Sequence, residues 1–263
     1  MSSAWTLTDL EFLVLWEEIN DDFLPLPLTF ASDAPDWDVL DAAKNAARDA
    51  LRPRRDYALA ELMDDLANAD IRVAVYGWDA AEPEKPDGRI RMHGARKGDR
   101  GYVVRQLPGK TIWHSAGFEI TRGDALGLAE AVVAALPEAM AGRDADVLLV
   151  APPESGAGEP DYSYGNSDVW DTFEDSVTSR AEQFLARPAA TRGAIEIGQG
   201  RSRFGPRGML RQQIGWWDVV DDGRYAVPPG SPRVASGVDA RRLVAMINTE
   251  IATVVRAIKD EWA

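Results

Sequence analysis

The sequence predicts an α+β fold, in which a central antiparallel sheet is built from two pseudo-two-fold-related halves and flanked by two helical groups. Amphipathic segments with helical periodicity lie at both ends of the 263-residue chain. Between them lie short alternating segments separated by Gly, Pro and Asp, which is typical of antiparallel hairpins. This order of elements occurs twice, so we expect two half-sheets that join and carry helices on their faces.

The first helical group is predicted from three amphipathic segments. The sequence TDLE at residues 8–11 is a capping box that begins the first helix. The apolar face of this helix carries Phe12, Leu15, Trp16 and Ile19. Pro25 and Pro27 impose an extended segment, and further helices are expected over 36–51 and 56–69.

The rest of the first half is expected to be a meander closed by a helix. A strand is predicted at 71–78, and the strands after it are expected at 89–96 (RIRMHGAR), 101–107 (GYVVRQL), 111–117 (TIWHSAG) and 118–121 (FEIT). A helix over 124–136 follows, and Pro137 limits it.

The second half begins after an irregular segment. Residues 146–153 are expected to form a buried strand, and a helix over 168–186 is expected to precede strands at 194–200, 209–220 and 224–228. Asp222-Gly223 suits a two-residue hairpin turn with positive φ angles. The final helix, at 239–262, has the most regular apolar stripe of the chain.

An internal repeat supports the two-half arrangement. Gly88 and Gly193 each begin a meander, and Gly101 and Gly208 each follow a basic loop. The spacing from Gly193 to Gly208 is two residues longer than that from Gly88 to Gly101. We expect a single domain over 1–263, with an N-terminal half at 1–151, a linker at 152–166 and a C-terminal half at 167–263.

Composition narrows the class of function. The chain has a net charge of -14, which disfavours nucleic acid and anionic membranes as partners. It has no cysteine, which is compatible with the reducing cytoplasm. No apolar run is long enough to span a bilayer. Two segments, 88–105 and 192–211, are basic; they are either solvated hairpin loops paired with neighbouring carboxylates or an edge that faces a partner.

Enzyme motifs are not matched. The LPGKT segment has Val104 where a phosphate-binding loop needs its first glycine, and GQGRSR at 198–203 lacks the third glycine of a dinucleotide fingerprint. His93 and His114 are the two imidazoles, and a histidine in a strand is usually structural. We therefore predict no catalytic, cofactor-binding or metal-binding residue.

The chain has nine tryptophans. Trp16, Trp37 and Trp170 lie on or beside helical stripes and are expected in the core. Adjacent Trp216 and Trp217 must point to opposite faces of a strand. One is expected to pack inward, and an exposed one beside Arg211 would suit a protein interface.

The order of motifs resembles the EspG family of type VII secretion chaperones in actinobacteria. The residues that carry the likeness are LTDLEFLVLWE at 7–17, LPLPL at 24–28 and WDVVDDGRYAV at 217–227. The resemblance implies a cytosolic, non-enzymatic protein that needs no cofactor. It also implies binding to the helical tip of the PPE-like subunit of a PE/PPE heterodimer, which keeps that subunit soluble and supports its export.

The family's contact surface involves the sheet, its loops and the C-terminal helix. Mapped onto this sequence, it suggests the partner-binding residues Arg96, Lys97, Arg100, Arg105, Trp113, Arg211, Trp216 and Met246. The GRY of the hairpin is interpreted as a fold signature. Two alternatives remain: another non-enzymatic binder, such as an immunity or adaptor protein, and a carboxylate-based enzyme.

Overall fold

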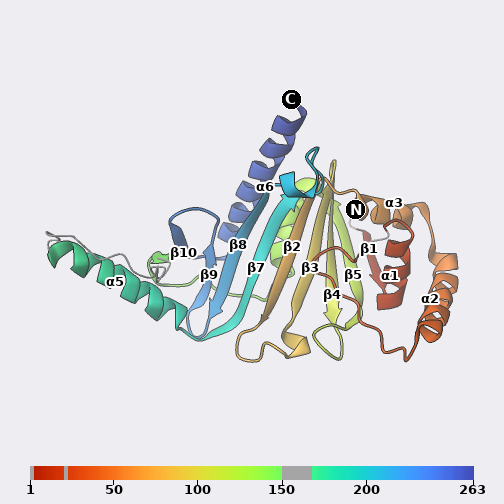
Figure 1. The fold of residues 1–263 in the computed structure, drawn as a ribbon, viewed down its shortest axis with the longest axis horizontal. Coiled ribbons are helices and arrows are strands. Elements are labelled where there is room, and N and C mark those ends of the chain that lie inside the picture. Colours follow the sequence, from red (N-terminus) through yellow and green to blue (C-terminus); the bar gives the residue numbers. More distant parts are fainter. Residues whose placement is uncertain (1–2, 21–22, 150–167) are drawn as a thin grey trace, which may run out of the picture.

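The computed structural model describes residues 3–20, 23–149 and 168–263, which form a ten-stranded antiparallel sheet with helices on both faces (Figure 1). The strands of the first half are β1 (Ser3–Leu7), β2 (Ile71–Asp79), β3 (Ile90–Lys97), β4 (Arg100–Pro108) and β5 (Ser115–Asp124). Those of the second half are β6 (Val147–Leu149), β7 (Ala189–Gln199), β8 (Arg211–Val219), β9 (Gly223–Val227) and β10 (Arg233–Gly237). The predicted fold class is confirmed.

The strand order is symmetric about the seam between β2 and β7. It runs β1-β5-β4-β3-β2-β7-β8-β9-β10-β6, with Val75 of β2 opposite Ile195 of β7 at the centre of the seam. Because β6 pairs with β10, the second half-sheet includes residues 147–149, which precede the predicted linker. The linker itself, 152–166, lies outside the described residues.

The structure corrects the strand alignment of the repeat. A short 3-10 turn with a Pro-x-Gly sequence precedes β3 at Pro86–Gly88 and precedes β8 at Pro206–Gly208. Gly88 therefore matches Gly208 and not Gly193, so the expected alignment is wrong by one strand. Glycine beside arginine recurs at several hairpins, and composition alone does not show which hairpins are related.

The helices are α1 (Asp9–Glu17), α2 (Trp37–Leu51), α3 (Tyr57–Ala67), α4 (Leu128–Ala134), α5 (Asp168–Leu185) and α6 (Ala240–Trp262). The predicted capping box begins α1, since the Thr8 hydroxyl accepts from the Glu11 amide at 3.1 Å and the Glu11 carboxylate accepts from the Thr8 amide at 2.9 Å. Asp36, Asp56 and Asp239 cap α2, α3 and α6 by accepting a first-turn amide. These bonds satisfy helix donors that have no intrahelical partner.

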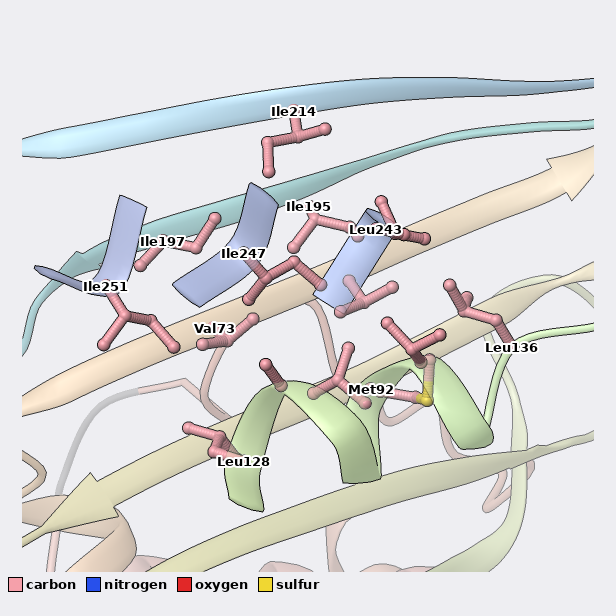
Figure 2. Packing of buried hydrophobic residues seen from close by; sticks show 14 of the residues in the cluster. Val73, Met92, Leu128, Leu136, Ile195, Ile197, Ile214, Leu243, Ile247 and Ile251 are labelled. Carbon is pink, nitrogen blue, oxygen red and sulfur yellow. The ribbon is translucent and has the colours of Figure 1, made fainter. Parts of the chain in front are cut away.

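The helices divide between the two faces of the sheet. On one face, α4 and α6 cover the strands on both sides of the seam and share a core with them. Figure 2 shows this core, which includes Val73, Ile195, Ile197, Ile214, Leu243, Ile247 and Ile251. On the other face, α1–α3 pack over the outer strands of the first half, and α5 packs through Phe184 over those of the second. Figure 1 shows these two groups beside opposite ends of the sheet.

Several element boundaries differ from the prediction. Residues 118–121 belong to one long strand, β5, because Gly117 takes a positive φ of 126° inside it without ending it. Residues 111–114 form the turn before that strand. Within the described part of the strand expected at 146–153, residues 147–149 form the short edge strand β6, whose Leu148 is exposed; residues 150–153 lie outside the described residues. The helix expected over 124–136 is an α-helix only from Leu128 to Ala134.

Strands β1 and β10 were not predicted, because each is short and lacks a clear alternation. Of the helical tryptophans, Trp16 is buried as expected, whereas Trp37 is 78% exposed at the first position of α2. The side chain of Trp170 lies outside the described residues. The prediction for Trp37 is wrong because its helix begins there, whereas the buried residues of α2, Ala47 and Leu51, lie in its later turns.

The hairpin between β8 and β9 has a three-residue loop. Val219 pairs with Gly223, and the Asp222 amide donates to the Val219 carbonyl at 3.2 Å. The left-handed residue is Asp221, with φ of 60°, so the expected two-residue turn at Asp222-Gly223 is wrong. Aspartate tolerates this conformation better than most residues. The longer loop turns the Asp222 side chain back toward the end of α5.

Asp222 organises a cluster of hydrogen bonds at that end. It accepts from the Tyr225 hydroxyl at 2.6 Å, from Arg187 at 2.6 Å and from the Arg143 amide at 2.8 Å. Burial acts to raise the pKa of Asp222, but these hydrogen bonds outweigh it and lower the pKa from 3.8 to about 2. The cluster fixes the start of β7 against β9.

A pH dependence of stability follows from this cluster. A carboxylate with a depressed folded-state pKa stabilises the fold above its unfolded pKa, and this contribution is lost as the pH falls through the folded value. We expect Asp222→Asn to lower the free energy of unfolding at pH 7 by on the order of 2 kcal/mol and to flatten the loss of stability between about pH 4 and 2. Urea unfolding across this range measures both effects. An unchanged pH profile in the variant would contradict the assignment.

Candidate partner-binding surface

The middle of the face that carries α1–α3 and α5 is lined by polar and aromatic side chains. On β2, Ile71, Val73 and Val75 point into the core under α6, so the residues between them point to the opposite face. The cross-strand register extends this face over β3, β7 and β8. We call this surface the open strip; it comprises Arg72, Tyr76, Trp78, Arg91, Arg192, Glu196, Arg211, Gln213 and Trp217, together with Ala74, Ala194, Gly198 and Gly215.

The strip lies between the two helical groups on one face. Arg72 is in register with Ala95 on β3, and Ala95 with Tyr102 on β4, both of which belong to the core under α1–α3. Trp217 is in register with Tyr225, which belongs to the core under α5. Phe184 of α5 meets Trp217 edge-on with ring centroids 6.3 Å apart. The large side chains of the strip remain half-buried or exposed.

One end of the strip is aromatic and cationic. Trp78, Arg192 and Trp217 lie opposite one another on β2, β7 and β8. Indole rings are large apolar surfaces, and guanidinium groups recognise carboxylates with several donors at once. Both residue types are enriched where one protein binds another.

The centre of the strip carries small residues. Gly215 pairs with Ala194, so the sheet backbone can be approached closely at this point. A Cβ atom added at Gly215 would lie 3.5 Å from the Trp217 ring, with no other heavy atom of the described chain within 4 Å. The space above this glycine is therefore open.

Arg72 and Arg192 occupy related positions on the two sides of the seam. Each lies three residues before the central residue of its strand, which is Val75 on β2 and Ile195 on β7. Arg72 donates to the carbonyl of Ala67, the last residue of α3, at 2.9 Å. Arg192 donates to the carbonyl of Leu185, the last residue of α5, at 3.4 Å. The two guanidinium groups are thus held by equivalent helix ends.

The strip has an excess of positive charge in an acidic chain. Among the described residues, Arg72, Arg91 and Arg192 form no ion pair with a carboxylate, and Arg211 lies 3.7 Å from Glu196. Burial, and then the neighbouring cation Arg201, lower the pKa of Arg72. Burial, and then Arg89, lower that of Arg91. These shifts indicate cations without a local counter-charge.

The two histidines have structural roles. His93 is fully buried, with Nδ1 2.8 Å from the carbonyl oxygen of Leu26, and it ties the proline-rich segment to β3. Burial lowers the pKa of His93 to about 4, so the ring is neutral at pH 7. The His114 ring lies within hydrogen-bonding distance of Thr111 and Asp33 in an exposed loop.

Four of the predicted partner-binding residues lie on or beside the face of the open strip. Arg211 belongs to the strip, and the exposed Trp113 borders it, because the Arg91 guanidinium lies 5.8 Å from the Trp113 ring centroid. Lys97 is paired with Asp70 at 3.0 Å. The fourth, Arg100, is held by two bonds to Asp65, at 2.5 and 2.8 Å. The contacts of Lys97 and Arg100 therefore agree with the interpretation of this basic segment as a loop paired with neighbouring carboxylates, and not with that of an edge facing a partner.

The other four lie on or under the opposite face. Arg96 and Arg105 point away from the strip, with Arg105 3.4 Å from Glu119. Met246 is half-buried against the core under α6. Trp216 is 0% exposed, so its assignment to a partner-binding surface is wrong. Its indole ring fills the space that Gly193 leaves free on the adjacent strand β7 and Gly77 leaves free on β2, the strand beyond it.

Sequence reasoning missed the strip residues on β2 and β7. The signal was the alternation in IRVAVYGW, where Arg72, Tyr76 and Trp78 alternate with Ile71, Val73 and Val75. The same reasoning applies to β8. Ile214 is apolar and Gln213 polar, which puts Trp216 in phase with the buried face and Trp217 in phase with the strip.

A hollow lies on the opposite face, beside α4. It has a volume of about 1000 Å³, lies between α4 and the first turn of α6, and has a mainly apolar lining that includes Val133, Leu136, Met140 and Val244. Met140 is 81% exposed there. This hollow is the competing candidate for a docking surface.

In the part of the chain that the structure describes, no helix is long and apolar enough to cross a bilayer. Nor do the described residues include a group of three or more acidic or imidazole side chains that could hold a metal ion.

Comparison with known proteins gives three results. The chain matches 96% of its length to 97% of a chain in a structure of the Mycobacterium tuberculosis type VII secretion system chaperone EspG5 in complex with the PE25-PPE41 dimer, with a TM-score of 0.56 and 13% sequence identity. No curated protein matches the sequence. The family model for the EspG family matches residues 8–249, which is most of the chain and includes α1, every strand of the open strip and the first part of α6. This protein therefore belongs to the EspG family.

Proposed function

We propose that this protein is a cytoplasmic type VII secretion chaperone that binds the helical tip of the PPE-like subunit of a PE/PPE heterodimer through the open strip. The structural observation behind the proposal is the strip itself: an aromatic and cationic surface with a small-residue centre, set between helical groups that leave it accessible. EspG5, which shares the fold, was solved in complex with the PE25-PPE41 dimer.

Such a chaperone acts by binding and without a covalent step. The apolar tip of an exported helical hairpin self-associates when it is free. A protein that covers the tip lowers the concentration of the free form by mass action. This keeps the client soluble until export, and it requires no nucleotide.

Co-expression tests the proposal. PE/PPE pairs of the host, beginning with any that are encoded adjacent to this gene, are co-expressed with the tagged chain, purified through the tag and passed over a size-exclusion column. We expect the three chains to elute together as one complex. Failure of every such PE/PPE pair to co-elute with the folded chain would overturn the proposed function.

A further inference from the structure

We infer that the client recognised by the open strip carries two acidic groups, one for Arg72 and one for Arg192, on either side of an apolar centre. The inference rests on the proposed function and adds the chemistry of the client's contact segment. It follows from the placement of charge on the strip and from the way the two arginines are held.

The two arginines mark opposite ends of the strip. Arg72 lies opposite Gly198, and Arg192 lies opposite Trp78. At about 3.3 Å per residue, the six-residue separation along the strands places them roughly 20 Å apart. Between them lie Ala74, Ala194 and Gly215, which present little side chain, together with Glu196 and with Tyr76, whose hydroxyl accepts from Gln213 at 3.2 Å.

Each guanidinium is held in place with donors to spare. One Nη atom of each bonds the terminal carbonyl of α3 or α5, and in each the buried Nε has no partner among the described residues. Five donors make an arginine able to bind a carbonyl and a carboxylate together. Because the helix end has already restricted the side chain, pairing with a client carboxylate loses less conformational entropy.

The charge of the strip favours an acidic client over a basic one. Glu196 is the acidic member of the strip, whereas Arg72, Arg91, Arg192 and Arg211 are its basic members. A carboxylate brought near Arg72 or Arg192 meets a cation that has no ion-pair partner among the described residues, whereas a lysine brought there meets like charge. Complementary charge of this kind sets partner choice and register.

Charge reversal tests the inference with the same PE/PPE pair that forms the complex. We expect Arg72→Glu and Arg192→Glu each to raise the Kd about tenfold or more, and the double variant to raise it about a hundredfold or more. Arg52→Glu is the matched control, because Arg52 is exposed just after α2, away from the strip and from α6, and its substitution makes the same change in net charge. It is expected to bind as the wild type does.

Folding and salt provide independent measurements. Arg72→Gln and Arg192→Gln keep a donor for the helix carbonyl and remove the charge; we expect weaker binding with thermal unfolding close to that of the wild type. We also expect the wild-type Kd to rise with NaCl concentration, and to rise less steeply for the double Gln variant.

The possible results separate the two proposals. If the wild type binds the pair while the Glu variants bind equally well and salt has no effect, the acidic-client inference is overturned and the chaperone function stands. If the wild type forms no complex with any pair, both are overturned.

Discussion

Gly215→Leu is expected to weaken complex formation strongly without unfolding the protein. The Leu side chain would stand at the centre of the open strip, where the neighbouring positions are Ala194 and the Trp217 ring. The new Cβ would make an ordinary contact with Trp217, and the backbone φ at this position lies outside the left-handed region. Glycine inside a strand is destabilising, so the variant is expected to be at least as stable as the wild type.

The loss should therefore be confined to binding. Blocking the centre of an interface removes its best-packed contacts, so we expect the Kd for the PE/PPE pair to rise by at least about 30-fold. Titration calorimetry or biolayer interferometry with the purified pair measures this change, and urea unfolding measures stability.

Gly123→Leu is the matched control. Gly123 lies on β5 and points to the opposite face, and no heavy atom lies within 4 Å of a Cβ added there. The control adds the same side chain to the same sheet, and its binding should equal that of the wild type. If both leucine variants bind normally and Val244→Glu, in the hollow beside α4, abolishes binding, the docking surface is on the other face and the strip assignment is wrong.

Trp216→Ala is expected to cost about 3–5 kcal/mol in the free energy of unfolding, the range for removing a buried aromatic side chain. The ring is fully buried, and it lies so close over Gly77 and Gly193 that a Cβ added to either would be 3.0 or 2.2 Å from its atoms. Removing it leaves a cavity that the two glycines cannot fill. Urea unfolding followed by circular dichroism measures the change.

Trp216→Phe and Trp217→Ala complete this test. The Trp216 indole nitrogen has no hydrogen-bond partner among the described residues, so Trp216→Phe loses volume without breaking such a bond and should cost less. Trp217 is half-buried on the strip, so Trp217→Ala should lower stability less than Trp216→Ala and weaken binding more. The reverse pattern, in which Trp217→Ala is the more destabilising, would show that the two faces have been assigned wrongly.

Local features were predictable from the sequence because their causes are local. The capping box at Thr8 and Glu11 and the apolar stripe of the last helix depend on residues within a few turns. The fold class was also predictable, since alternation and turn residues mark antiparallel hairpins.

The open strip and the strand alignment of the repeat depend on contacts between distant segments. Nothing near Arg72 in the sequence indicates that β2 pairs with β7, and that pairing creates the strip. The same applies to Arg100. Its neighbours in the sequence left open whether the loop pairs with carboxylates or faces a partner, because the carboxylate that binds it, Asp65, comes from the distant helix α3.

The seam between β2 and β7 makes the stability of each half of the sheet depend on the other half. It joins two strands along nine positions, and α6 packs over strands from both sides of it. A fragment that ended between the halves would leave a long unpaired edge and would remove part of the cover from its apolar face. Such an edge is a template for aggregation, so this architecture favours folding of the two halves as one cooperative unit.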